Sequence, residues 1–248
     1  KLAAPPPGLA RPQGSRPRMS TATAPEAPAP RPLVSIIIPC LDEDAVLPET
    51  LRRLRGLAEA TPDCAFEFVL VDDGSTDGTM AVLRAAAAAD DRLRVLSLSR
   101  NFGQQIAVTA GLDIARGDAV VLMDADLQAP PEVARQMIAL WREGFDVVYG
   151  QRASRIGDGW FKRATARGFH RLMNRLSDTP IPPDSGDFRL MSRPVVDVLR
   201  QMPERHRFLR GMVAWAGFRQ TALPYDRPPR FAGTTKYPLR RMLAFALD

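Results

Sequence analysis

The spacing of hydrophobic residues changes several times between residues 33 and 150. Short, almost continuous apolar runs, typical of strands buried on both faces, occupy Val34–Ile38, Phe66–Val71, Leu93–Leu98, Ala119–Met123 and Asp146–Tyr149. Segments with helical spacing fall between these runs, at about 46–58, 77–89, 104–116 and 131–142. The alternation predicts one α/β domain with a mostly parallel sheet flanked by helices. Ligands of such sheets bind beyond the carboxyl ends of the strands, so the loops there are the candidate site.

Composition sets the first 32 residues apart from the rest. They are dominated by Pro, Ala and Arg and hold few branched apolar residues, so we expect a disordered leader over residues 1–32. The two cysteines, Cys40 and Cys64, lie 24 residues apart without a CxxC pattern, which argues against a disulfide or zinc framework. No stretch approaches the roughly 18 apolar residues of a spanning helix. We therefore expect a protein of the reducing cytosol.

Charge is distributed unevenly along the chain, whose net charge is +6. Residues 33–150 hold 10 basic and 19 acidic side chains, whereas residues 151–248 hold 19 basic and 8 acidic ones. An acidic half followed by a basic half favours a metal site beside an anion site. We therefore expect no nucleic-acid partner.

Two acidic loops follow the first two expected strands. The first reads Pro39-Cys40-Leu41-Asp42-Glu43-Asp44, and the second reads Asp72-Asp73-Gly74-Ser75-Thr76-Asp77-Gly78. Asp77 is interpreted as a helix N-cap, and the two glycines as parts of a tight turn. Asp42 and Asp73 are the better candidates for contacts with a nucleotide.

The fourth expected strand ends in Asp124-Ala125-Asp126-Leu127-Gln128. Two carboxylates one residue apart at the end of a buried strand repel each other and lose hydration unless a cation lies between them. Hard oxygen ligands suit Mg²⁺ or Mn²⁺, which would bridge to a substrate diphosphate. Neither GxGxxG nor GxxxxGK[ST] follows any strand, which argues against dinucleotide-binding and P-loop proteins.

Three later segments each leave two interpretations open. The loop Asp184–Leu190 places Asp187 and Arg189 near a glycine, either as a turn with an internal ion pair or as part of the site. An expected helix, Trp160–Leu176, carries a row of arginines that is either a solvated face or a lane for phosphate or lipid headgroups. This row of arginines in the expected helix consists of Arg163, Arg167, Arg171 and Arg175, with Arg152 and Arg155 just upstream. The stretch Gly233–Leu247 is interpreted as an amphipathic helix, either at a membrane surface or packed on the domain.

Six motifs in order resemble glycosyltransferase family two, and within it the polyprenyl-phosphate branch that includes dolichol-phosphate mannose synthases and bactoprenol glucosyltransferases. The resemblance runs from about Val34 to Asp248. The motifs are Ser35–Pro39 with Asp42-Glu43, Val71–Asp77, Arg100-Asn101-Phe102-Gly103, Asp124–Gln128, Ser185–Arg189 and Gly233-Thr234-Thr235-Lys236-Tyr237.

This resemblance implies a GT-A catalytic domain over residues 33–232, followed by a membrane-proximal segment at 233–248 that we expect to lead into transmembrane helices. It assigns Asp187 as the base near the acceptor, and Asp126 as the second catalytic residue. Nucleotide-sugar contacts fall on Pro39, Asp42, Glu43, Asp73, Gly103, Asp124, Ala125 and Asp126. Metal contacts fall on Asp124, Asp126 and Gln128. Acceptor-phosphate contacts fall on Arg152, Arg163, Arg167, Arg189 and Lys236.

The activity implied is metal-dependent, inverting transfer of one sugar from a UDP- or GDP-sugar to a polyprenyl phosphate at the cytosolic face of the plasma or ER membrane. The Gln-x-x-Arg-Trp motif of processive synthases is absent, which favours single-sugar transfer. Cys40-Leu41-Asp42-Glu43 replaces the usual Tyr-Asn-Glu, so either Asp42 or Glu43 contacts the base. Two alternatives remain: a family member acting on a soluble saccharide or protein hydroxyl, and a non-catalytic scaffold that binds nucleotide sugar. The sequence also leaves self-association open.

Overall fold

The computed structural model describes residues 30–152, 185–205 and 207–229, and all of these but Pro30 belong to one structural unit, residues 31–248. Its strands are β1 (Leu33–Cys40), β2 (Ala65–Asp72), β3 (Leu93–Ser97), β4 (Ala119–Leu122), β5 (Val147–Arg152), β6 (Ser185–Ser192) and β7 (Gln220–Tyr225). Its helices are α1 (Leu47–Glu59), α2 (Thr79–Ala89), α3 (Gln104–Ile114), the short 3-10 helix η1 (Pro131–Val133), α4 (Ala134–Arg142), α6 (Arg193–Gln201) and α7 (Leu209–Trp215). The five expected strands and four expected helices are confirmed, with shifts of a few residues at their ends.

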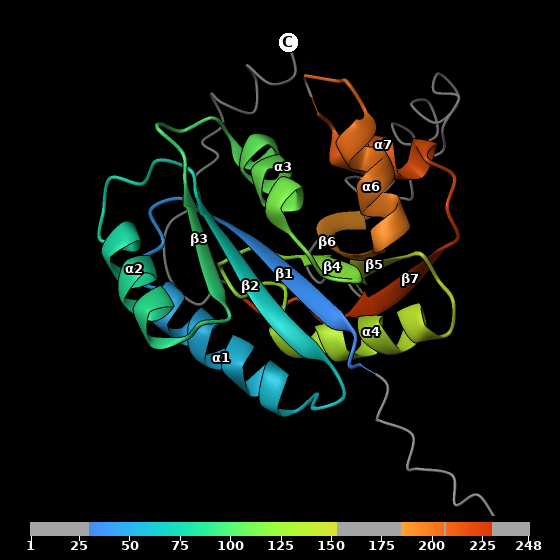
Figure 1. Cartoon of the computed structure of the whole chain (residues 1–248), viewed down its shortest axis with the longest axis horizontal. Helices are drawn as coiled ribbons and strands as arrows, with labels where there is room; N and C mark the ends of the chain where they lie inside the picture. Colours follow the sequence, from blue (N-terminus) through green and yellow to red (C-terminus); the bar gives the residue numbers. More distant parts are fainter. Residues whose placement is uncertain (1–29, 153–184, 206, 230–248) are drawn as a thin grey trace, which may run out of the picture. The chain divides into compact units, whose positions relative to one another are not determined.

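The strands form one mixed sheet in the order β3-β2-β1-β4-β6-β5-β7 (Figure 1). All neighbouring pairs are parallel except those of β6, which runs antiparallel to β4 and to β5. The expected mostly parallel sheet is therefore confirmed. Because β6 is reversed, it begins at the edge where β4 ends.

Helices cover both faces of the sheet (Figure 1). On one face α1, α2 and α4 pack against alternate strand residues such as Ile36 and Ile38. On the other face α3, α6 and α7 pack against the intervening residues, among them Ile37. All three of these isoleucines are fully buried. Burial on both faces explains why the strand sequences are continuously apolar rather than alternating.

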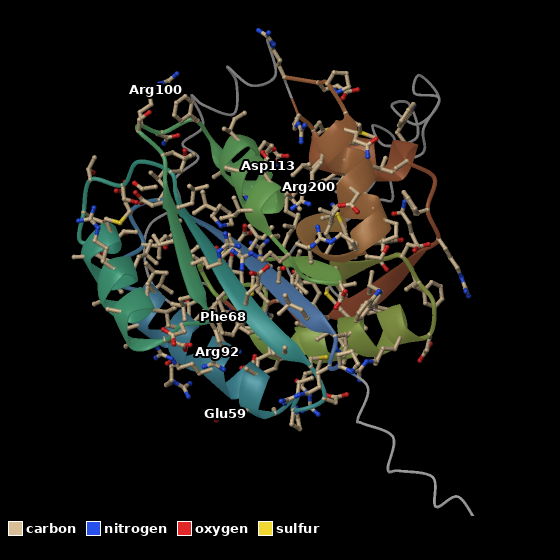
Figure 2. The ribbon with its side chains drawn as sticks, in the orientation of Figure 1. Glu59, Phe68, Arg92, Arg100, Asp113 and Arg200 are labelled. Carbon is tan, nitrogen blue, oxygen red and sulfur yellow. The ribbon has the colours of Figure 1, made fainter. Side chains whose placement is uncertain are left out.

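Two arginines of α6 fix the carboxyl end of α3. Arg200 donates hydrogen bonds to the backbone carbonyls of Ala115 at 2.7 Å and Asp113 at 3.1 Å. Figure 2 labels Arg200 and Asp113. Arg193 donates from Nε to the carbonyl of Gly117 at 2.8 Å. The bond to Asp113 satisfies a carbonyl that the end of the helix leaves without a partner, and the bonds to Ala115 and Gly117 fix the backbone that follows the helix. The helix is thereby held in place, and its opposite end reaches the candidate site.

The segment Asp184–Leu190, expected as a loop, is largely strand, since β6 begins at Ser185. The expectation was wrong because Gly186 and two charged residues hide a pattern in which Phe188 and Leu190 are buried on one face of the sheet. Sequence analysis also did not identify α6, α7 and β7. The expected leader, the expected helix Trp160–Leu176 and the segment 233–248 lie wholly or almost wholly outside the described residues. None of the helices in the described ranges is long and apolar enough to cross a bilayer.

Candidate active site

The loops that follow β1 and β2 are joined at the carboxyl edge of the sheet. The backbone N–H of Asp42 donates to Ser75 Oγ at 2.9 Å, and Asp42 Oδ1 accepts the backbone N–H of Thr76 at 2.8 Å. Asp42 itself is exposed and has a positive φ of 47°. Glu43 is half-buried, and its backbone N–H donates to Thr79 Oγ1. Asp42 and Glu43, the two residues predicted to contact the nucleotide, therefore lie at the carboxyl edge of the sheet, as expected. Hydrogen bonds to the loop that follows β2 hold their own loop in shape.

Asp73 is buried and binds the loop that follows β3. Its two carboxylate oxygens accept the backbone N–H groups of Phe102 and Gly103, each at 2.8 Å. The nucleotide contact predicted for Asp73 remains a prediction, and the structure adds a structural role that the sequence did not reveal. Asp77, expected as an N-cap, lies one residue before the N-cap Gly78 and accepts the N–H of Thr79.

Gly74 is the point of closest approach between the β2 and β3 loops. Its φ is +75°, and a Cβ added there would lie 2.5 Å from the carbonyl carbon of Arg100. We expect Gly74→Ala to lower the free energy of unfolding by about 3 kcal/mol, since it adds backbone strain and a clash with backbone atoms. Urea unfolding measures this loss. Gly56→Ala is the control: with open space in α1, it should gain about 0.5–1 kcal/mol. Similar values for the two variants would contradict the tight contact.

The remaining predicted nucleotide contacts lie at the ends of neighbouring elements. Pro39 is near the end of β1, where it pairs in register with Val71 of β2. Gly103 is the N-cap of α3 and has a φ of 98°. Ala125 is buried, and its carbonyl accepts a hydrogen bond from Thr50 Oγ1 at 2.9 Å. Thr50 thereby fixes the backbone between the two carboxylates of the Asp-x-Asp motif.

Asp124 and Asp126 lie close together at the end of β4. Burial, followed by repulsion from Asp126 and Asp187, raises the pKa of Asp124 to about 6. Attraction by Arg227 and Arg210 opposes this rise in the pKa. The conflict expected from two neighbouring carboxylates at a buried strand end is therefore present in the structure. A cation bound between the two carboxylates would reduce this repulsion.

Two glutamines orient the ends of this motif. Gln104, the first residue of α3, donates from Nε2 to Asp124 Oδ1 at 2.8 Å. Asp126 is buried, and its Oδ1 accepts the backbone N–H of Gln128 at 3.0 Å. The side-chain oxygen of Gln128 accepts a hydrogen bond from Arg227. Gln104 and Arg227 are contacts that sequence analysis missed, because they come from distant parts of the chain.

The donor set fits Mg²⁺ or Mn²⁺ bound jointly by protein and substrate. Within the ranges that the structure describes, no cluster of three or more His, Cys, Asp or Glu is arranged to hold a metal ion. Asp124 and Asp126 supply two hard carboxylates, and Mg²⁺ is commonly held by one or two carboxylates together with phosphate oxygens and water. Gln128, the third predicted ligand, already accepts a bond from the cationic Arg227. Its metal contact stays a prediction.

Asp187 faces Asp124 across the pair of strands β4 and β6. Leu122 is opposite Arg189, so continuing this antiparallel register places Asp124 opposite Asp187. Arg210, on α7, donates from Nε to Asp187 Oδ1 at 2.7 Å and from Nη2 to Oδ2 at 3.1 Å. The hydrogen bond to Asp187 in turn raises the pKa of Arg210. Arg210 is a further site residue that the sequence did not reveal.

Arg189 adds a second guanidinium group beside this ion pair. Only 4% of Arg189 is exposed, and burial lowers its pKa to about 10, so it stays charged at neutral pH. Its Nη2 donates to the carbonyl of Gly186 at 2.9 Å. Of the other predicted acceptor contacts, Arg152 ends β5. Arg163, Arg167 and Lys236 lie outside the described residues.

Because the pKa of Asp124 is raised in the folded protein, the free energy of unfolding should depend on pH. The ordinary pKa of an aspartate is 3.8, so between pH 3.8 and about 6 the folded protein holds a proton that the unfolded chain has released. Binding of this proton stabilises the folded state, and this stabilisation is lost as the pH rises through about 6. We expect Asp124→Asn to be more stable than the parent by about 1–3 kcal/mol at about pH 8 without divalent metal, and by much less at about pH 4. Urea titrations at both pH values measure the difference, and a pH-independent difference would contradict it.

A mostly parallel sheet with two neighbouring carboxylates at its carboxyl edge fits the GT-A fold expected from the sequence. Comparison of the sequence with known families agrees, since residues 35–200 match the family Glycosyl transferase family 2. The chain belongs to this family.

Several curated proteins are similar to this chain over most of its length. It is 46% identical to the uncharacterized glycosyltransferase YkcC of Bacillus subtilis over 86% of the chain and 66% of that protein. It is 39% identical to a prophage bactoprenol glucosyl transferase homolog of Escherichia coli, and to the bactoprenol glucosyl transferase of Shigella phage SfV, over 87% of the chain and 70% of each. The chain thus spans about two thirds of the length of these relatives.

Solved structures support the same fold at lower sequence identity. The mannosyltransferase PcManGT of Pyrobaculum calidifontis, in complex with GDP-Man and Mn²⁺, is 22% identical with a TM-score of 0.56, over 79% of this chain and 56% of that one. Glucosyl-3-phosphoglycerate synthase of Mycobacterium tuberculosis, with Mn²⁺, UDP-glucose and phosphoglyceric acid, is 19% identical with a TM-score of 0.55, over 87% and 76%. The GT-A-like fold expected from the sequence is therefore confirmed.

Proposed function

We propose that this chain is the catalytic domain of an inverting glycosyltransferase that moves one sugar from a nucleotide diphosphate to a polyprenyl phosphate. We place the reaction at the cytosolic face of a membrane, where such a lipid presents its phosphate. The similarity to bactoprenol glucosyl transferases over 87% of the chain supports this acceptor class.

The observation that carries the proposal is the pairing of Asp187. Both of its carboxylate oxygens accept hydrogen bonds from Arg210, and the buried, charged Arg189 lies beside the pair. A hydroxyl acceptor needs a base to remove its proton, and such a base works best with a free oxygen. A phosphate monoester has a second pKa of about 6 and is mostly dianionic at neutral pH. The site has two guanidinium groups, and its carboxylate, Asp187, already accepts hydrogen bonds from Arg210. Such a site suits a phosphate acceptor, which is ionised before it binds.

The proposed reaction is an in-line displacement with inversion. An oxygen of the acceptor phosphate forms a bond to the anomeric carbon while the bond from that carbon to the nucleoside diphosphate breaks, and the electron pair leaves with the diphosphate. Asp124 and Asp126 would hold Mg²⁺ or Mn²⁺, and such a cation would neutralise charge on the leaving diphosphate. Arg189 and Arg210 hold the acceptor anion, and Asp187 fixes the direction of Arg210. The loops containing Asp42, Glu43 and Asp73 would receive the nucleoside.

Transfer of radiolabelled sugar tests the proposal. The full chain is incubated with Mn²⁺ and a panel of UDP- and GDP-sugars, with either a short-chain polyprenyl phosphate or the corresponding polyprenol as acceptor. We expect label in the organic phase only with the phosphate, since the polyprenol has no ionised oxygen. Transfer to soluble saccharides but not to polyprenyl phosphate would favour the soluble-acceptor alternative. Binding of a nucleotide sugar with neither transfer nor hydrolysis would favour the scaffold.

A further inference from the structure

The exposed large hydrophobic side chains gather on two helices. Among the described residues there are four, and their exposed fractions are 41% for Phe102, 37% for Ile106, 51% for Phe208 and 69% for Trp215. Phe102 and Ile106 flank the start of α3, and Phe208 and Trp215 lie at the two ends of α7. Single exposed apolar residues are ordinary, whereas a group of four on adjoining elements indicates a surface with a partner.

The two helices meet at their N-terminal ends. The side-chain oxygen of Gln105 accepts the backbone N–H of Leu209 at 3.2 Å, which links the first turn of α3 to the first turn of α7. Both helices lie on the same face of the sheet (Figure 1). Phe208 and Trp215 are seven residues apart, so they share one side of α7. Another side of α7 carries the buried Leu209 and packs on the core. We call the four exposed side chains the α3–α7 patch.

The charged residues close to this patch in sequence are mostly arginines, and the acidic exceptions are the exposed Glu204 beside Arg205 and the exposed Asp113 near the far end of α3. Neither residues 100–112 nor residues 205–225 contain an aspartate or glutamate, although both segments contain arginine. The Arg100 guanidinium lies 4.1 Å from the centre of the Phe102 ring, and both residues are exposed (Figure 2 labels Arg100). Arg205, just before Phe208, is also exposed. Aromatic and aliphatic side chains surrounded by arginines are typical of surfaces that enter the headgroup layer of anionic membranes.

The same helices carry site residues. Gln104 of α3 binds Asp124, and Arg210 of α7 binds Asp187. The patch therefore borders the side of the site where the acceptor arginines lie. We propose that the α3–α7 patch docks on the headgroup layer of an anionic lipid bilayer and brings this side of the site against the membrane. This inference rests on the proposed function, because docking at a membrane serves the reaction only if the acceptor is a lipid in that membrane.

A second copy of the chain fits this surface less well. A symmetric dimer through the patch would place the same arginines opposite each other, and like charges at an interface oppose association. The excess of arginines over acidic residues near the patch also disfavours a basic protein partner. An anionic bilayer supplies both the apolar layer for the four side chains and the negative charge for the arginines.

Vesicle co-sedimentation of the full chain tests the docking. Vesicles contain either phosphatidylcholine alone or phosphatidylcholine with phosphatidylglycerol. We expect the parent to bind the anionic vesicles more tightly, and the double variant Phe208→Ser/Trp215→Ser to bind them about tenfold more weakly, since two partly buried aromatic contacts are lost. Arg205→Glu is expected to weaken binding about tenfold at low salt. Its matched control is Arg135→Glu, an exposed arginine of α4 on the opposite face, which should change binding less than about twofold.

Three results would overturn the inference. The parent could fail to prefer anionic vesicles, or the double variant could bind as the parent does with an unchanged circular dichroism spectrum. Sedimentation velocity could also show that the parent is a dimer that the same substitutions dissociate, which would make the patch a self-association surface. Transfer to a water-soluble, short-chain polyprenyl phosphate separates this inference from the proposed function. The double variant should retain that transfer, and absence of it in the parent would count against the function and not against the patch.

Discussion

Asp126→Ala is expected to lower kcat/KM for sugar transfer by at least about 1000-fold, because the variant removes half of the cation site that we propose at the end of β4. Asp126 is buried beside Asp124, and its Oδ1 also accepts the backbone N–H of Gln128. Loss of the side chain therefore affects both the charge and the turn. Single-turnover transfer at saturating Mn²⁺ measures the effect on the chemical step. Asp113→Asn, an exposed carboxylate on α3, is the control and should stay within about twofold of the parent.

Asp187→Asn is expected to retain far more activity in the same assay. If the acceptor is already ionised, Asp187 acts mainly by orienting Arg210, and an asparagine still accepts one of its two hydrogen bonds. A loss of about 10- to 100-fold is expected, without the shift in pH dependence that removal of a general base would cause. Equal and complete losses in Asp126→Ala and Asp187→Asn would contradict this assignment.

The fold could be predicted from the sequence because its signal is local. Each parallel strand is buried on both faces, so runs such as Ile36–Ile38 are apolar at every position and stand out from the helical segments. β6 lacked this signal because Gly186 and the charged Asp187 and Arg189 interrupt the apolar pattern. The charges are tolerated there because they belong to the site and find partners in space.

The candidate site could be predicted in part, for the same reason. Asp124 and Asp126 follow a recognisable strand, and the conflict between them is visible in their spacing. The partners Gln104 and Arg210 have no such signal, since their contacts with Asp124 and Asp187 join positions 20 and 23 residues apart on different elements. Likewise, only the antiparallel register between β4 and β6 places the carboxylates of Asp124 and Asp187 opposite each other. Roles that depend on packing of distant elements therefore had to come from the structure.

Arg210→Gln is expected to have the second largest effect among the described site residues. The change leaves Asp187 half-buried without its bidentate partner and close to Asp124, whose pKa is already raised by repulsion from Asp187. We expect the free energy of unfolding to fall by about 1–3 kcal/mol near neutral pH, less than for a fully buried pair because the Arg210 side chain is 36% exposed. Transfer should fall about 100-fold, since under the proposed function the acceptor loses one of the two guanidinium groups that hold it.

A double-mutant cycle separates the structural effect of Arg210 from its role with the acceptor. Adding Asp187→Asn to Arg210→Gln removes the unpaired carboxylate, so the double variant should recover most of the lost stability. It should not recover the affinity for polyprenyl phosphate, because the guanidinium group is still missing. Urea unfolding and the KM for the acceptor, measured for all four proteins, give the two coupling energies. If stability and acceptor KM recover together, Arg210 acts only through the fold, whereas recovery of stability alone identifies it as a ligand of the acceptor phosphate.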